Sequence, residues 1–181
     1  MKEIEKYLRN TKNIQTVLSE INSELPQLVA GLSGSGRNLL TNILFEELQK
    51  PVIVLTPNLL QATQVYEDIS QIAPEVPIHI FPVEESVAAE LAFSSPEYRS
   101  QRVETLDFLK SGKKGIVVIP AAGFKKILSP ASIWETHCLD FSIGMELDLE
   151  NLPEKLVAMG YTRERMVASP GEFSIRGGII D

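Results

Sequence analysis

The sequence has little cysteine and no excess of positive charge. Its single cysteine, Cys138, excludes an intramolecular disulfide and is typical of a reducing compartment. The net charge of −7 argues against a general DNA- or membrane-binding surface, because neutralising phosphates requires an excess of lysine and arginine. No apolar run approaches the roughly 20 residues of a membrane span, and residues 1–10 lack the apolar core of a signal peptide. These absences predict a cytoplasmic protein that does not insert into a membrane.

Histidine is also scarce, and this limits metal and acid–base chemistry. The two histidines are His79, inside an expected strand, and His137, in a linker. His137 and Cys138 form an adjacent pair without a second cluster of ligands, so we expect no metal site. The basic pairs at 113–114 and 125–126 are typical of solubilising charges in turns.

The richest feature that is present is a glycine-rich segment at residues 27–40. Gly31 and Gly36 have the spacing of a P-loop, G-x-x-x-x-G-K-[ST], whose backbone N–H groups surround phosphates at the start of a helix. The phosphate-binding lysine is replaced by Arg37, and the Mg²⁺-binding hydroxyl by Asn38. We therefore interpret the segment as a degenerate P-loop with a structural role and expect no bound ATP or Mg²⁺. Its residues are Gly31, Ser33, Gly34, Ser35, Gly36, Arg37 and Asn38.

Three other functions could use a segment of this kind. A nucleotide-dependent ATPase would use Arg37 in place of lysine, but Walker B and helicase motifs are missing from the sequence. A serine hydrolase would use Ser33, because residues 31–35 nearly match G-x-S-x-G, but the partners of a catalytic triad are not evident. A dinucleotide fingerprint is rejected, because Leu39 occupies its third glycine position.

Apolar runs and helical patterns alternate along residues 1–127, which predicts a P-loop-type, doubly wound parallel α/β sheet. The expected strands are 28–31, 51–56, 78–81 and 116–119; the expected helices are 4–21, 39–48, one that starts at 57–58, and 96–110.

The pattern changes after residue 127, and residues 128–181 predict a small α+β domain with antiparallel pairing. Apolar residues alternate loosely over 138–149, and a short helix follows at 151–159. Because residues 179–181 read as an apolar strand with nothing after it, we expect this domain to be incomplete and the chain to be cut from something longer.

Three stretches carry a resemblance to a known family: the loop at 31–36, the helix start at 95–102 and, most specifically, residues 171–181. Together they resemble the N-terminal region of bacterial transcription-repair coupling factors (Mfd), which is itself similar to the excision-repair protein UvrB. The resemblance implies a RecA-like domain without ATPase activity at 1–127, similar to UvrB domain 1a. It implies a UvrA-recruiting domain at 128–181, similar to UvrB domain 2.

The same resemblance suggests the partners and the residues that bind them. Arg163 and Arg176 match arginines on the UvrA-binding face of UvrB, and we expect Phe173 to lie near them. Alternation along residues 173–176 predicts Phe173 and Ile175 on one face, with Ser174 and Arg176 on the other. Ser174 departs from the arginine of UvrB.

The resemblance also suggests the function of the whole module. It would recruit UvrA to stalled RNA polymerase at DNA lesions in transcription-coupled nucleotide excision repair. In the family, ATP and Mg²⁺ serve an ATP-dependent DNA translocase motor in C-terminal regions that are missing here and that would contact this module. The DNA-clamping tyrosine hairpin of UvrB corresponds to residues 82–99, which offer only Phe93 and Tyr98 as aromatics. We therefore expect no specific DNA binding by this chain alone.

Overall fold

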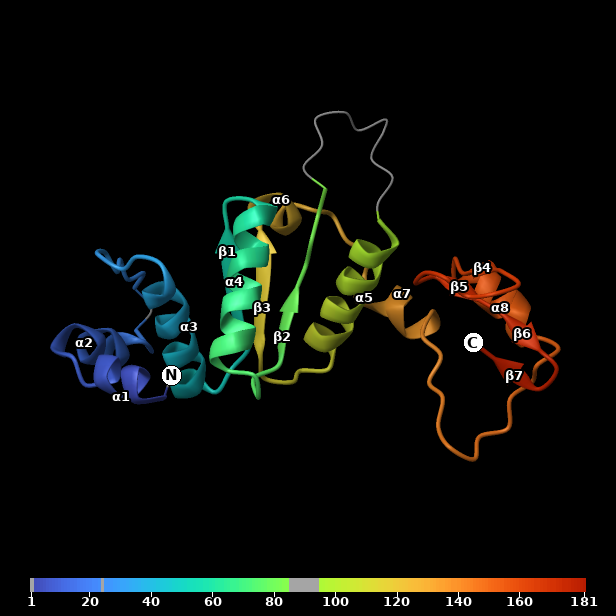
Figure 1. Cartoon of the computed structure of the whole chain (residues 1–181), viewed down its shortest axis with the longest axis horizontal. Coiled ribbons are helices and arrows are strands. Elements are labelled where there is room, and N and C mark those ends of the chain that lie inside the picture. The colour runs from blue at the N-terminus through green and yellow to red at the C-terminus, as the bar shows by residue number, and fades with distance from the viewer. Residues whose placement is uncertain (1, 24, 85–94) are drawn as a thin grey trace.

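The computed structural model describes residues 2–23, 25–84 and 95–181. A three-stranded parallel sheet forms the centre of the first part of the chain, with strands in the order β1-β3-β2 (Figure 1). The strands are β1 (Val52–Thr56), β2 (Ile78–Ile80) and β3 (Ile116–Pro120). Val118 of β3 lies in register with Val54 on one side and Ile80 on the other. The chain is therefore a mixed α/β protein with a small parallel sheet, as the sequence predicted.

The central strand β3 is buried on both faces, which explains its uninterrupted apolar sequence. Ile116 and Val118 pack in the cluster that contains Ala62 and Ile69 of α4 (Leu59–Ile72). The alternate residues of β3, Val117 and Ile119, pack in a second cluster with Phe108 of α5 (Pro96–Lys110). The two helices that connect the strands thus cover opposite faces of the sheet.

Both crossover helices begin at residues whose side chains cap them. The Asn58 side chain accepts a hydrogen bond of 2.9 Å from the backbone N–H of Gln61 at the start of α4. Ser95 caps α5 in the same way, and Pro96 occupies the first turn, where the N–H that proline lacks is not needed. These caps explain why the helix starts could be predicted from the sequence.

The expected single helix at 4–21 is wrong, because two helices form instead. They are α1 (Lys2–Arg9) and α2 (Lys12–Glu20), separated at Thr11, whose backbone is extended. The Thr11 hydroxyl donates a hydrogen bond of 2.7 Å to the carbonyl of Leu8, a local contact that competes with helix continuation. The two helices pack on α3 (Ser35–Leu48), where Ile14 of α2 forms an apolar cluster with Leu40 and Ile43 of α3.

The expected strand at 28–31 is also not formed. These residues lack strand pairing, and Leu28 is 94% exposed. A strand requires hydrogen bonds from a neighbour, and none of the strands that the structure describes pairs with this segment. The helix after the glycines does form, as α3.

The carboxy-terminal part of the chain is built from short elements. They are α7 (Ala131–Thr136), α8 (Leu152–Ala158), β4 (Thr162–Arg163), β5 (Glu172–Phe173), β6 (Ile175–Arg176) and β7 (Ile179–Ile180); α6 (Ala121–Phe124) precedes them and contacts β1 and β3 of the central sheet. The antiparallel pair β6–β7 matches the predicted α+β pattern, but β4 and β5 pair in parallel. Leu152, Leu156 and Phe173 form the core here.

The loosely alternating segment at 138–149 forms no strand. Most of its apolar side chains are exposed, most fully Ile143, whereas Leu149 packs against Leu152 and its neighbours; a turn at Gly144 interrupts the segment. No helix among the described residues is both long and apolar enough to cross a bilayer.

Candidate functional site

The glycine loop leads directly into α3, and two backbone N–H groups at this junction donate hydrogen bonds to carbonyls of the loop itself. Gly31 and Gly34 have φ values of 86° and 51°, a region that side chains with a Cβ rarely adopt. The N–H of Gly36 donates to the Ser33 carbonyl at 3.1 Å, and the N–H of Arg37 donates to the Gly34 carbonyl at 3.3 Å. In a working P-loop such N–H groups point at phosphate oxygens. Here these two donors already have partners within the turn.

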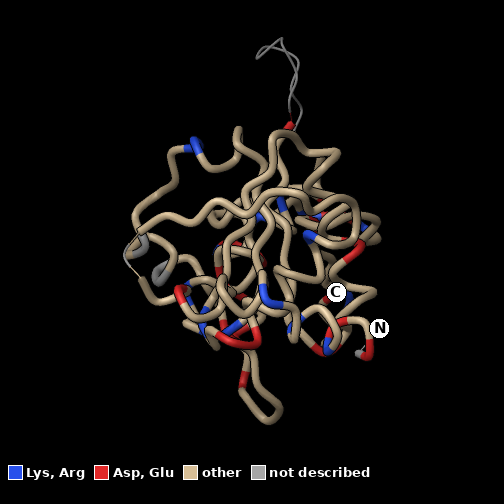
Figure 2. Tube along the Cα trace, turned by 90° about the vertical axis from the view of Figure 1, so that its left-hand side faces the viewer, with Lys and Arg blue, Asp and Glu red and all other residues tan. Residues whose placement is uncertain are grey.

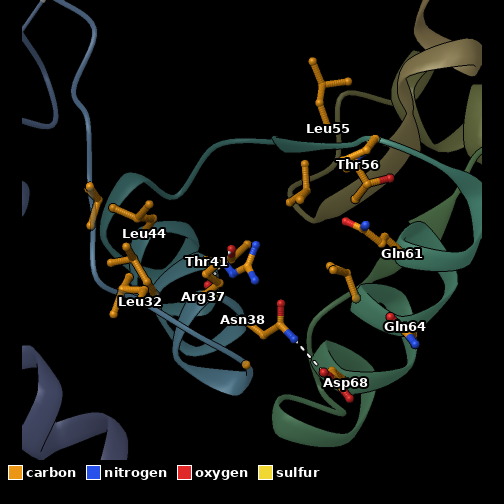
Figure 3. A pocket seen from close by; sticks show the side chains of 16 residues that line it. Leu32, Arg37, Asn38, Thr41, Leu44, Leu55, Thr56, Gln61, Gln64 and Asp68 are labelled. Carbon is orange, nitrogen blue, oxygen red and sulfur yellow. Dashed lines mark hydrogen bonds between the residues drawn. The ribbon is translucent and has the colours of Figure 1, made fainter.

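Asn38 occupies the position of the Mg²⁺-binding hydroxyl of a P-loop. Its side chain makes a hydrogen bond between two helices. It is only 6% exposed, and its Nδ2 donates a hydrogen bond of 2.7 Å to Oδ2 of Asp68 in α4 (Figure 3). This bond links α3 to α4. Asp68 is a residue that the sequence analysis missed, because no motif relates it to a partner thirty residues earlier.

An open cleft of about 660 Å³ lies beside this contact, between α3, the end of β1 and α4. Figure 3 shows the Arg37 side chain within it, with Gln61 and Gln64 on the α4 side. Asp68 is the only carboxylate among the described residues that line the cleft. No group of three or more metal-ligating side chains occurs in the described parts of the chain. The cleft therefore presents one arginine and several amides, and its own side chains do not form a cation site.

Neither histidine contributes to this cleft, so the hydrolase hypothesis gains no support. His79 of β2 stacks on Phe108, with ring centroids 4.3 Å apart. Burial lowers the pKa of His79 below its ordinary value of 6.5, and nearby Glu104 partly opposes that shift. His137 lies directly after α7, where its Nδ1 is 2.9 Å from the carbonyl oxygen of Ile133.

The expected partner residues lie on the short strands of the carboxy-terminal part. Arg163 of β4 is in register with Phe173 of β5, and Arg163 is exposed. Phe173 is only 2% exposed, because its ring packs against Leu152 and Leu156. Arg176 of β6 is exposed and pairs with the Asp181 carboxylate. Arg163 and Arg176 are therefore open to solvent, while the Phe173 ring is buried in the core of this part.

Ser174 separates β5 from β6 and is buried. Its hydroxyl donates to the Arg165 carbonyl at 3.1 Å, and its backbone exchanges two hydrogen bonds with Asp181. Alternation puts Ser174 on the same face as Arg176, but the two side chains differ in exposure, because the Ser174 side chain is buried and its hydroxyl bonds a backbone carbonyl while Arg176 is exposed.

Glu172 is a second residue that the sequence analysis missed. Its carboxylate accepts hydrogen bonds from the backbone N–H groups of Ala168 and Ser169, at 2.8 and 3.1 Å, and from the Ser169 hydroxyl at 2.8 Å. These bonds, led by that of Ala168, lower the pKa of Glu172 below its ordinary value of 4.5. The sequence did contain a signal for this turn, because Pro170 and Gly171 are typical turn residues and Glu172 directly follows them.

Residues 139–181 match the family described as the UvrB interaction domain. This range contains Arg163, Phe173 and Arg176.

Over its whole length the chain is similar to transcription-repair-coupling factors. It is 36% identical over 182 residues to the protein of Bacillus subtilis, covering 100% of the chain and 16% of that relative. It is 37% identical over 164 residues to the protein of Staphylococcus epidermidis, covering 91% of the chain and 14% of that relative. The family resemblance seen in the sequence is therefore confirmed, and the chain spans about a sixth of the length of these relatives.

Proposed function

We propose that this chain is a non-catalytic interaction module of a transcription-repair-coupling factor, in which it recruits UvrA to RNA polymerase stalled at DNA lesions. The observation that carries the proposal is the match of residues 139–181 to the UvrB interaction domain, together with the exposure of Arg163 and Arg176 within that range. Exposed arginines suit a protein partner, because the planar guanidinium binds carboxylates with two hydrogen bonds.

The first part of the chain acts in this proposal as a RecA-like scaffold without nucleotide chemistry. The contact between Asn38 and Asp68 supports this role, because it occupies the side chain that would otherwise face a metal ion. The parent protein would be an ATP-dependent DNA translocase that carries its motor in other regions. Those C-terminal regions are the second expected partner of this module, and the cytoplasm is its expected location.

Specific DNA binding forms no part of the proposed role. Figure 2 shows acidic and basic residues intermingled along the trace, and the net charge of −7 opposes approach to a polyanion. Phe93, which belongs to the segment that would correspond to the DNA-clamping hairpin of UvrB, lies outside the described residues.

The test measures binding of purified UvrA to the immobilised chain. Wild type should bind, and Arg163→Glu and Arg176→Glu should each weaken binding at least tenfold without changing the melting temperature, because charge reversal places like charges against the partner. Lys113→Glu is the matched control, since Lys113 is exposed and lies in the first part of the chain. If UvrA binds both arginine variants as it binds wild type, this surface is not the interface. Absence of UvrA binding to wild type would refute the proposed function itself.

A further inference from the structure

A groove lined by residues outside the range 139–181 runs along α5. Two adjoining hollows of about 310 and 250 Å³ lie between α5, the segment 126–129 and Trp134 of α7. The hollows share Leu106, Leu128, Ser129 and Trp134, so they form one continuous depression, here called the α5 groove.

The floor and walls of the α5 groove are mainly apolar and reachable from solvent. Val103 is 50% exposed, Leu128 47% and Ile127 95%, and Trp134 is half-buried. Contiguous apolar surface that stays exposed and is surrounded by polar groups is typical of a protein interaction site. The apolar surface alone does not identify the occupant.

The charged residues that line the α5 groove, among those that the structure describes, are all basic. Arg99, Arg102 and Lys110 border it from α5, and Lys126 borders it from the opposite side. No aspartate or glutamate is among the described residues that line it. In a chain with 24 acidic and 17 basic residues, this local separation of charge is unexpected.

Helix α5 itself produces this separation. Arg99, Val103, Leu106 and Lys110 follow one another at helical spacings of four, three and four, so they form one stripe. The acidic residues of the same helix lie outside the groove lining: Glu97, Glu104 and Asp107.

Three of the four cations are available to a ligand. Arg102 is held in place by a hydrogen bond of 3.0 Å to the Pro82 carbonyl and by Glu84 at 3.8 Å. Arg99, Lys110 and Lys126 make no ion pair within the residues that the structure describes. A ligand that carries carboxylates would therefore gain charge-assisted contacts without displacing existing pairs.

We propose that the α5 groove binds an extended, acidic segment of a partner protein, with an apolar side chain of that segment seated on Leu106, Leu128 and Trp134. Complementary charge selects an acidic partner and orients it, while the apolar floor supplies affinity. A single-stranded nucleic acid fits less well, because such ligands stack on several aromatic rings and Trp134 is the only aromatic side chain beside Phe81 in the described lining. The basic pair at 125–126 thus has a role through Lys126 that its sequence context did not suggest.

The test titrates the full chain into a fluorescein-labelled peptide in which glutamate alternates with leucine around one central phenylalanine, with fluorescence anisotropy as the readout. We expect saturable binding that weakens at least tenfold when every glutamate of the peptide is replaced by glutamine. The double variant Arg99→Glu/Lys110→Glu should also lose at least tenfold in affinity. Lys12→Glu/Lys113→Glu is its matched control, because both lysines are exposed, lie outside the groove and change the net charge equally.

A second variant examines the apolar part of the groove. Ile127→Ser should weaken the peptide without lowering the melting temperature, because the Ile127 side chain is almost fully exposed in the free chain. Three results would each overturn the proposal: no saturable binding, equal affinity for the glutamate and glutamine peptides, or preferential binding of a single-stranded oligonucleotide that the Arg99→Glu/Lys110→Glu variant abolishes. The peptide titration contains no UvrA, so a negative result here would not count against the proposed function, which the UvrA-binding experiment tests separately.

Discussion

The Nδ2 atom of Asn38 donates a hydrogen bond of 2.7 Å to the carboxylate of Asp68, and this bond joins α3 to α4 directly after the glycine loop. A loop with P-loop spacing thus opens a helix whose fourth residue packs against a neighbouring helix. The position that serves nucleotide chemistry in a working P-loop serves the packing of this fold.

The first prediction concerns the energy of this contact. Asn38→Ala and Asp68→Ala should each lower the free energy of unfolding by about 1 to 2 kcal/mol, because each variant loses the hydrogen bond between the buried Asn38 amide and a carboxylate. The double variant should be hardly less stable than either single one. Urea unfolding of the four proteins measures this coupling. Glu67→Ala is the control on the same helix, since Glu67 is exposed; fully additive losses for Asn38 and Asp68 would show that the bond contributes nothing.

The second prediction concerns nucleotide binding. Calorimetric titration with ATP and Mg²⁺ should detect no binding to wild type, because Arg37 and Asn38 replace the two side chains that hold phosphate and metal. The variant Arg37→Lys/Asn38→Thr should also fail to bind, since the N–H groups of residues 36 and 37 are bonded within the loop. Micromolar binding with turnover by wild type would contradict the assignment of a structural loop. A bound sulfate would not, because helix N-termini attract anions without the lysine.

The third prediction concerns pH and the turn at residues 168–172. The hydrogen bonds to Glu172 hold its pKa below the ordinary value of 4.5, so its carboxylate stabilises the folded turn above that value. This contribution should be lost as the pH falls from about 4.5 through the lower pKa of the folded state. Amide exchange at Ala168 and Ser169 should accelerate in that interval beyond its intrinsic pH dependence.

Glu172→Gln should remove this acceleration, while Glu164→Gln, on a nearby exposed side chain, should leave it unchanged. Protection at Ala168 that stays constant down to pH 2 in wild type would show that the carboxylate does not hold the turn.

Local sequence information predicted the three strands and the crossover helices well. The apolar run of β3 and the caps at Asn58 and Ser95 determine conformation through near neighbours. The strand expected at 28–31 failed for the opposite reason, because pairing depends on a neighbouring strand, and the described sheet supplies none there. The alternating segment at 138–149 failed in the same way. Sequence patterns identify a surface that is suited to pairing, but the pairing partner is a property of the tertiary structure.

The last prediction separates the roles of Phe173 and the arginines in the proposed UvrA interaction. Phe173 is packed against Leu152 and Leu156, so Phe173→Ala should cost about 3 to 5 kcal/mol of stability, and the more conservative Phe173→Leu about 1 to 2 kcal/mol. If the ring acts only by supporting the strands, Phe173→Leu should bind UvrA within twofold of wild type at a temperature where it is folded. Arg163→Glu should lose at least tenfold at an unchanged melting temperature. Biolayer interferometry and thermal unfolding on the same samples give both quantities. A tenfold loss for Phe173→Leu without loss of stability would mean that UvrA contacts the ring, which would require β5 to open when the complex forms.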